Sequence, residues 1–129
     1  MAYFFLVMGN DNIMYKLSKK RILKKNKHFQ AVYRHGKSFA NRYMVLYVLK
    51  SRCEEGRVGF AAGKRLGNAV IRNRVKRLLR EAYRLNRHNI AVGVDLIIVG
   101  RQAVIDKGYT LVEDSFIKLC SKAGIVKDC

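Results

Sequence analysis

Apolar residues recur at helical spacing through the segment GKRLGNAVIRNRVKRLLREAYR, residues 63–84, and again at Leu85. Positions 71, 75, 78, 82 and 85 are apolar and step by four, three, four and three residues. At about 100° per residue these positions lie on one stripe of an α-helix. The opposite side carries polar and basic residues, namely Asn73, Lys76, Arg77, Arg80 and Arg84. The pattern therefore predicts a helix with one buried apolar face and one exposed row of cations.

Two segments before this helix alternate from residue to residue, as β-strands do. In NRYMVLYVLKS, residues 41–51, one face carries Tyr43, Val45, Tyr47 and Leu49, and the other carries Met44, Leu46 and Val48. The segment RVGFAAG, residues 57–63, has Val58, Phe60 and Ala62 on one side and small residues opposite. Because the polar loop SRCEEG joins the two segments, we expect them to pair as an antiparallel hairpin.

A first helix and an interior strand are predicted on either side of these elements. The segment NKHFQAVYRHG, residues 26–36, indicates a short helix that Asn26 caps and Gly36 ends. One side of this helix carries Phe29, Val32 and Tyr33. The segment VGVDLIIVGR, residues 92–101, is apolar on both faces after Asp95 and is typical of an interior strand. Asp95 is expected to form hydrogen bonds at the strand end.

The last helix is expected to begin at TLVED, residues 110–114, where Thr110 and Glu113 fit a capping box. Its inner stripe is predicted to be Val112, Phe116, Leu119, Cys120 and Ala123. The expected order is helix, two or three strands, helix, strand, helix around one mixed sheet. The fold class is therefore an α/β (α+β) sandwich.

The chain of 129 residues has the length of one domain, which we place at residues 16–125. Residues 1–15 are expected to be an N-terminal extension, and residues 126–129 a short C-terminal tail. The opening MAYFFLVM has no preceding positive residue and no cleavage site after it, so it does not resemble a secretion signal. Met14 is an alternative start.

The charge of the chain is far from ordinary, with a net charge of +18 and a pI near 10.3. Such a surface repels itself unless a polyanion accompanies it, so nucleic acid is the expected partner. Adsorption to an anionic membrane is the competing possibility, but no run approaches the roughly 20 apolar residues of a membrane span. Three widely spaced cysteines favour the reducing cytoplasm, and Cys120 is expected to be a buried apolar residue.

The sequence offers no catalytic site of its own. Nine acidic residues are scattered without the clustering that a metal-dependent nuclease requires. His28, His35 and His88 lie beside basic residues, without metal-ligand spacing, and no phosphate-binding loop of the P-loop type is present. We therefore expect no catalytic residue, no protein-held metal and no small-molecule substrate.

Two surfaces are candidates for RNA binding. The first is the row of cations on the central helix, preceded by Lys64 and Arg65, which suits the phosphates of a folded RNA. A solvated helix face is the alternative, but such faces normally alternate in sign. The second is a groove lined with aromatic rings and rimmed by lysines, suited to single-stranded RNA. Its residues are Phe29 and Tyr33 on one helical face, Tyr43 and Tyr47 on one strand face, and Lys24 and Lys25. Core packing is the alternative for Phe29.

The central helix also carries a specific resemblance. Its RNR triplet, Arg72, Asn73 and Arg74, is followed by VKRLLRE, and this resembles the protein component of bacterial ribonuclease P. The likeness continues upstream through LKKNKHFQAVYRHGKSFANRYMVLYVL and RVGFAAGKRLGNAV, and more weakly downstream through DLIIVGR. It implies a four-stranded mixed sheet with three helices in the order α-β-β-β-α-β-α. This fold has a left-handed crossover and is similar to the second domain of ribosomal protein S5.

The resemblance also implies a function. The protein would assist a catalytic RNA that removes the 5′ leader from precursor tRNA, with Mg²⁺ bound mainly by the RNA subunit and the substrate. The catalytic RNA would contact the basic helix and its neighbours, namely Lys64, Arg65, Arg72, Asn73, Arg74, Lys76, Arg77, Arg80 and Arg84. The leader would contact the cleft of Phe29, Tyr33 and Tyr47. A ribosomal or assembly protein that binds rRNA is the alternative.

Overall fold

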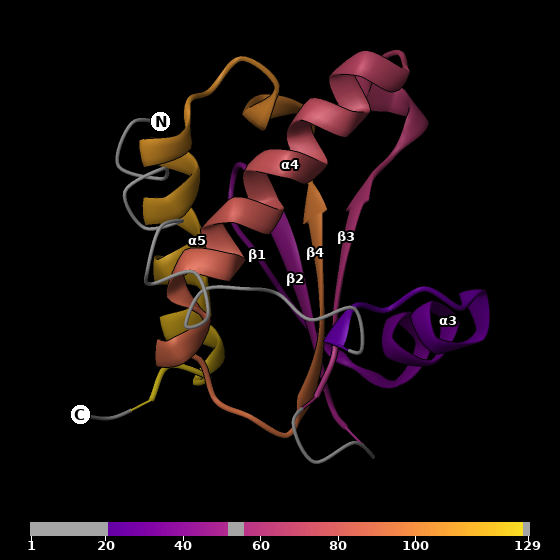
Figure 1. The fold of residues 1–129 in the computed structure, drawn as a ribbon, viewed down its shortest axis with the longest axis vertical. Helices are drawn as coiled ribbons and strands as arrows, with labels where there is room; N and C mark the ends of the chain where they lie inside the picture. The colour runs from indigo at the N-terminus through magenta and orange to yellow at the C-terminus, as the bar shows by residue number, and fades with distance from the viewer. Residues whose placement is uncertain (1–20, 52–55, 128–129) are drawn as a thin grey trace, which may run out of the picture.

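The computed structural model describes residues 21–51 and 56–127, and these form one sheet with helices on both faces (Figure 1). The chain runs through α3 (Asn26–His35), β1 (Lys37–Ala40), β2 (Met44–Lys50) and β3 (Val58–Ala62). It continues through α4 (Ala69–Asn86), β4 (Val94–Gly100) and α5 (Tyr109–Ala123). Single 3-10 turns occupy Lys64–Leu66, Arg87–Asn89 and Gln102–Val104. The predicted order of three helices and a four-stranded mixed sheet is confirmed.

The pairing of the strands differs from the sequence prediction. The sheet order is β1-β2-β4-β3, with β1 and β4 antiparallel to β2 and β3 parallel to β4. The predicted hairpin between β2 and β3 is therefore wrong, because β4 lies between them. Residues 96–98 of β4 are buried, so this strand has an apolar surface to cover on both faces and takes the central position.

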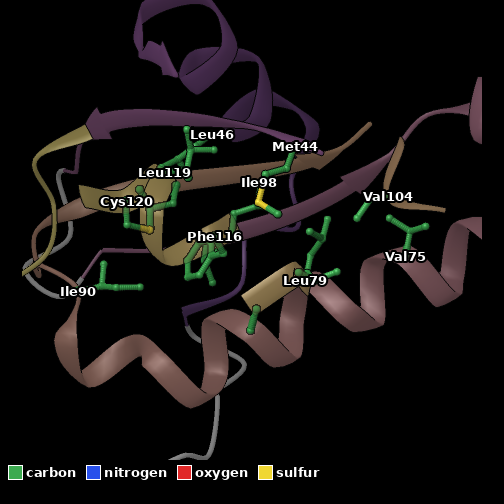
Figure 2. Packing of buried hydrophobic residues seen from close by; sticks show 14 of the residues in the cluster. Met44, Leu46, Val75, Leu79, Ile90, Ile98, Val104, Phe116, Leu119 and Cys120 are labelled. Atoms are coloured by element: carbon green, nitrogen blue, oxygen red, sulfur yellow. The ribbon is translucent and has the colours of Figure 1, made fainter. Parts of the chain in front are cut away.

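Each face of the sheet has its own apolar cluster. The larger cluster lies between the sheet and the pair α4 and α5, and its centre includes Leu46, Leu79, Ile98 and Phe116 (Figure 2). The smaller cluster lies under α3, where Leu23, Val32 and Ile97 are buried. The predicted inner stripe of α5 is confirmed, since Val112, Phe116, Leu119 and Cys120 are buried and Ala123 packs against them.

The central helix rests closely on the sheet at Gly100. A Cβ atom at residue 100 would lie 2.5 Å from Cγ1 of Val75, so only glycine allows this approach of helix and strand. The start of α4 is fixed by Asn68, whose side chain accepts a hydrogen bond from the backbone N–H of Ile71 at 3.1 Å. The apolar stripe of α4 is thus committed to the core, with Val75, Leu79 and Ala82 buried.

Two predicted helix caps are absent. Residue Lys25 precedes α3 at the capping position, so Asn26 is the first helical residue; Gly36 follows the helix as predicted. The last helix begins at Tyr109 after Gly108, and Thr110 is exposed inside its first turn. The Glu113 carboxylate instead accepts hydrogen bonds from the Tyr109 hydroxyl at 2.7 Å and from the Asn86 side chain at 2.9 Å. Glu113 therefore joins α5 to α4 and does not cap its own helix.

Candidate nucleic-acid interface

The solvent side of α4 presents a row of basic side chains. Asn73, Arg74, Arg77 and Arg80 are exposed and Lys76 is half-buried, while Lys64 and Arg65 are exposed in the turn just before the helix. Within residues 21–51 and 56–127, no Asp or Glu forms an ion pair with Arg72, Arg77 or Arg80. The charges of these three arginines are therefore available to an external polyanion.

Two of the predicted RNA-binding arginines are used inside the protein. The prediction that Arg84 lies on the solvent side is wrong, since it is only 8% exposed and its Nε donates to Glu81 at 2.6 Å. The physical reason is that Glu81 lies three residues earlier on the same side of α4 and neutralises the Arg84 guanidinium within the protein. Arg74 is exposed, yet its guanidinium donates to the backbone carbonyls of Ile105 and of Lys107, the latter at 3.2 Å. Arg74 thus links α4 to the loop that precedes α5 through two hydrogen bonds.

Three aromatic rings line up between α3 and the sheet. The ring centroids of Phe29 and Tyr33 are 6.3 Å apart, and those of Tyr33 and Tyr47 are 4.9 Å apart in an edge-to-face arrangement. Tyr33 remains 39% exposed, and partial burial raises the pKa of its hydroxyl, with a smaller contribution from Tyr47. The predicted association of Phe29, Tyr33 and Tyr47 is therefore present in the structure.

Tyr43 does not belong to this aromatic set. The side chain of Asn41 accepts hydrogen bonds from the backbone N–H groups of Tyr43 at 2.9 Å and Met44 at 3.0 Å. This turn ends before β2 begins, so Tyr43 does not follow the alternation of the strand. Its ring packs against the larger cluster on the other face of the sheet. The prediction that Tyr43 and Tyr47 share a strand face is wrong.

A hollow of about 360 Å³ joins the two predicted surfaces. Its walls are the apolar side chains of Ile22, Leu23, Phe29 and Phe60 and the polar side chains of Asn73, Lys76, Arg77 and Arg80. We call this hollow the edge groove, because it lies beside β3, which is one of the two edge strands of the sheet. The sequence predicts that Phe29 and the α4 cations lie on two separate surfaces. In the structure they line the same groove. The groove also includes Ile22, Leu23 and Phe60, which periodicity alone does not distinguish from core residues.

Phe29 is shared between the core and the edge groove. Its side chain is half-buried and packs against the smaller cluster, and the same ring forms part of the groove wall. The exposed side chains of Lys24 and Lys25 precede it, and the carbonyl of Lys25 accepts a hydrogen bond from the Phe29 N–H at 3.2 Å. These two lysines therefore lie at the start of the helix that carries the aromatic wall.

Arg57 and Asp95 form a largely buried ion pair next to His28 of α3. Asp95 is 4% exposed and accepts hydrogen bonds from the backbone N–H of Arg57 at 2.9 Å and from its guanidinium at 3.1 Å. This confirms the predicted hydrogen-bonding role of Asp95. Arg57 also contacts Nδ1 of His28 at 2.8 Å, a bond that neutral histidine accepts. Desolvation, and then the charges of Arg57, Lys27 and Lys25, lower the pKa of His28.

Neither a cluster of potential metal ligands nor a helix suited to span a membrane is found among the described residues. In the part of the chain that the structure describes, no three His, Cys, Asp or Glu side chains cluster closely enough to hold a metal ion. No helix among residues 21–51 and 56–127 is both long and apolar enough to cross a bilayer. Cys120 is buried as predicted, and this burial raises the pKa of its thiol to about 12. Glu54, Glu55, Cys53 and Cys129 lie outside the described residues.

Comparisons with known proteins agree on one family. A family model described as Ribonuclease P matches residues 17–124. The ribonuclease P protein component of Clostridium botulinum strain Langeland is 47% identical over 108 residues, which is 83% of this chain and 97% of that protein. The corresponding protein of Natranaerobius thermophilus is 47% identical over 105 residues, covering 81% and 91%.

Solved structures of the same family share the fold. The RNase P protein of Staphylococcus aureus superposes with a TM-score of 0.76 at 32% identity and covers 83% of this chain and 98% of its own. The RNase P protein of Thermotoga maritima superposes with a TM-score of 0.71 at 26% identity, covering 78% and 94%.

Proposed function

The chain belongs to the ribonuclease P protein family, and we propose that it is the subunit that helps a catalytic RNA remove the 5′ leader from precursor tRNA. The single observation that carries the detailed proposal is the edge groove, where Phe29 lies in one hollow with Lys76, Arg77 and Arg80. An aromatic ring beside cations is the combination that binds single-stranded RNA, since bases stack on the ring and phosphates meet the charges.

We assign the leader to the edge groove and to the adjoining rings of Tyr33 and Tyr47. The catalytic RNA is assigned to the rest of the basic surface at the start of α4, including Lys64, Arg65 and Arg72. Arg72 supports this assignment, because it is half-buried at the start of α4 and no acidic residue among residues 21–51 and 56–127 pairs with its charge. An RNA phosphate is the partner that this charge would take.

The chemistry is assigned to the RNA subunit, with Mg²⁺ held by that RNA and the substrate. The net charge of +18 supports this assignment, because it suits a protein that binds RNA and offsets phosphate repulsion. Cations near the two RNAs would lower the Mg²⁺ concentration that the reaction requires. The reducing cytoplasm is the proposed location, in keeping with three unclustered cysteines.

Leader binding is tested by comparing precursor and mature tRNA. The holoenzyme should bind precursor tRNA more tightly than mature tRNA, and Phe29→Ala should reduce this preference about five- to a hundredfold, the range expected for one stacked base. Lys122→Gln, which removes an exposed cation from α5, should leave the preference unchanged. Equal binding of the two tRNAs by the wild-type holoenzyme would refute the assignment of the leader to the groove.

The family match favours this role over that of a ribosomal or assembly protein. Insertion of α4 into a membrane surface is disfavoured by the structure, because its apolar stripe packs on the sheet.

A further inference from the structure

The outer side of α3 forms a second basic surface that faces solvent. Lys27, Gln30, Ala31, Arg34 and His35 line a hollow of about 320 Å³ on this side of the helix. We call these residues the α3 outer face. Lys27 and Arg34 are exposed and lie two helical turns apart, or roughly 10 Å along the axis. Both therefore present their charges to the same ligand-sized depression.

The cations of the α3 outer face have no acidic partner nearby in sequence. The chain contains twelve Lys and Arg residues, and no Asp or Glu, between Asp11 and Glu54. Among the described residues, neither Lys27 nor Arg34 forms an ion pair. A merely solvated helix face normally mixes charges so that residues three or four apart attract each other. The α3 outer face lacks this arrangement.

The position of Lys27 is unfavourable for the isolated protein. The N-terminus of a helix carries partial positive charge and is stabilised by acidic residues. The first turn of α3 contains no acid, its capping residue is Lys25, and no side chain caps it. Lys27 therefore adds repulsion where an acid would stabilise the helix. A bound anion would reverse the sign of this interaction.

The α3 outer face and the edge groove are on different sides of α3. Val32 is buried between α3 and the sheet, and Phe29 lies in the edge groove, whereas the side chains of the outer face line a separate hollow. In Figure 1, α3 lies on the face of the sheet opposite α4 and α5. The side chains of Lys27, Gln30, Arg34 and His35 on its outer side are exposed. A nucleotide stacked on Phe29 cannot also occupy the hollow of Lys27 and Arg34.

We propose that the α3 outer face is a second phosphate-binding surface, which holds the backbone of a structured RNA segment distinct from the strand in the edge groove. This inference rests on the proposed function, because it takes the RNA partners of the family as given. It makes α3 an element held between two RNA segments, one on its aromatic side and one on its basic side. Lys27 and Arg34 supply the phosphate contacts, and Gln30 and His35 add hydrogen-bonding groups.

The test compares two double variants of equal net charge. Lys27→Gln/Arg34→Gln removes two cations from the α3 outer face, and Lys122→Gln/Lys127→Gln removes two exposed cations elsewhere. Affinity is measured for the catalytic RNA, and for precursor tRNA with the reconstituted holoenzyme, as a function of salt concentration. The first variant should weaken at least one of these affinities about tenfold and reduce its salt slope by about 0.7 to 0.9 for each phosphate that is no longer neutralised. The control variant should change both affinities less than about twofold.

Folding and the edge groove are monitored separately. Lys27→Gln should unfold at the same or a higher urea concentration than wild type, because it removes repulsion at the helix N-terminus. Binding of a ten-nucleotide single strand, the probe for the edge groove, should be unchanged in Lys27→Gln/Arg34→Gln and reduced in Phe29→Ala. If only the affinity for the catalytic RNA falls, that RNA occupies the α3 outer face. If only the affinity for precursor tRNA falls, the precursor occupies it. If both affinities of the outer-face variant equal those of the control, the proposal is overturned, whatever the result for Phe29→Ala.

Discussion

The ring of Phe29 lies directly on the backbone of β3 at Gly59. A Cβ atom at residue 59 would lie 2.6 Å from Cζ and 2.7 Å from Cε1 of the Phe29 ring. No other residue of β3 is a glycine, so the ring occupies the one position where the strand has no side chain. Gly59 thus determines how closely the Phe29 ring approaches the sheet and how much of the ring lines the edge groove.

Gly59→Ala should therefore move Phe29 and weaken precursor binding. We expect the free energy of unfolding to fall by about 1–3 kcal/mol, the usual effect of overpacking, as measured by urea denaturation. Holoenzyme affinity for precursor tRNA should fall while affinity for mature tRNA stays constant. Ala61→Gly is the matched control, since it should cost about 0.5–1 kcal/mol in the same strand without adding an atom beneath the ring. Unchanged precursor binding in Gly59→Ala would argue against the groove assignment.

Arg77→Gln and Arg74→Gln should have opposite effects on binding and stability. Arg77 lines the edge groove, so its removal should weaken RNA binding and flatten the salt dependence with little change in unfolding. Arg74 donates to two backbone carbonyls, so its removal should lower the free energy of unfolding by about 1 kcal/mol. Urea denaturation and RNA titrations in two salt concentrations separate the two cases. The same pattern in both variants would contradict the internal role of Arg74.

Asp95→Ala should be among the most destabilising single changes in this protein. It leaves the Arg57 guanidinium, which is largely buried, without its carboxylate, and loss of one partner of a buried pair costs about 3–5 kcal/mol. Asp114→Ala is the control, because Asp114 pairs with Lys118 at 3.0 Å on an exposed face of α5. Exposed pairs of this kind contribute about 0.5 kcal/mol or less. Similar destabilisation in the two variants would show that burial does not govern the Asp95 pair.

His28 should make the stability depend on pH. Its pKa is lowered in the folded protein, so folding favours the neutral form, which accepts the hydrogen bond from Arg57. This contribution is fully present above the ordinary histidine pKa of about 6.5 and is lost as the pH falls through the lower folded value. The groups that face His28 are Arg57, Asp95, Lys27 and Lys25.

The measurement is urea denaturation of wild type and His28→Gln between about pH 7.5 and about pH 5.5. Wild type should lose more stability than the variant over this interval, and the difference isolates His28 from the other titrating groups. Parallel pH profiles would show that protonation of His28 does not disturb its contact with Arg57.

Local sequence patterns predict the buried residues of each element more successfully than they predict which strands pair with each other. The alternation in β2 and the apolar stripe of α4 depend on short-range spacing, and both are present in the structure. The partner of β3 depends on the whole sheet. The sequence does contain a relevant signal, because an interior strand needs two neighbours, and β4 is predicted to be interior. Placing β4 between β2 and β3 satisfies that requirement, and the hairpin does not.

The errors at single residues also have physical causes. Glu81 is the only acid in residues 63–84 and precedes Arg84 by three positions, the spacing of an ion pair on a helix. That spacing could have indicated that Arg84 is neutralised internally. Asn41 is typical of a turn, which could have indicated that the strand begins only after Tyr43. The edge groove itself joins α3, β3 and α4, and no periodicity within one element predicts how three elements meet.

The contact of Val75 with Gly100 fixes where α4 lies relative to the sheet. With a helix resting directly on strand backbone, α4 cannot shift toward the sheet, and the interval between Phe29 and the arginines is set by the hydrophobic core. The spacing of the proposed binding surface is therefore set by the core of the free protein. In the proposed function, a bound single strand would adopt the spacing that the protein already has.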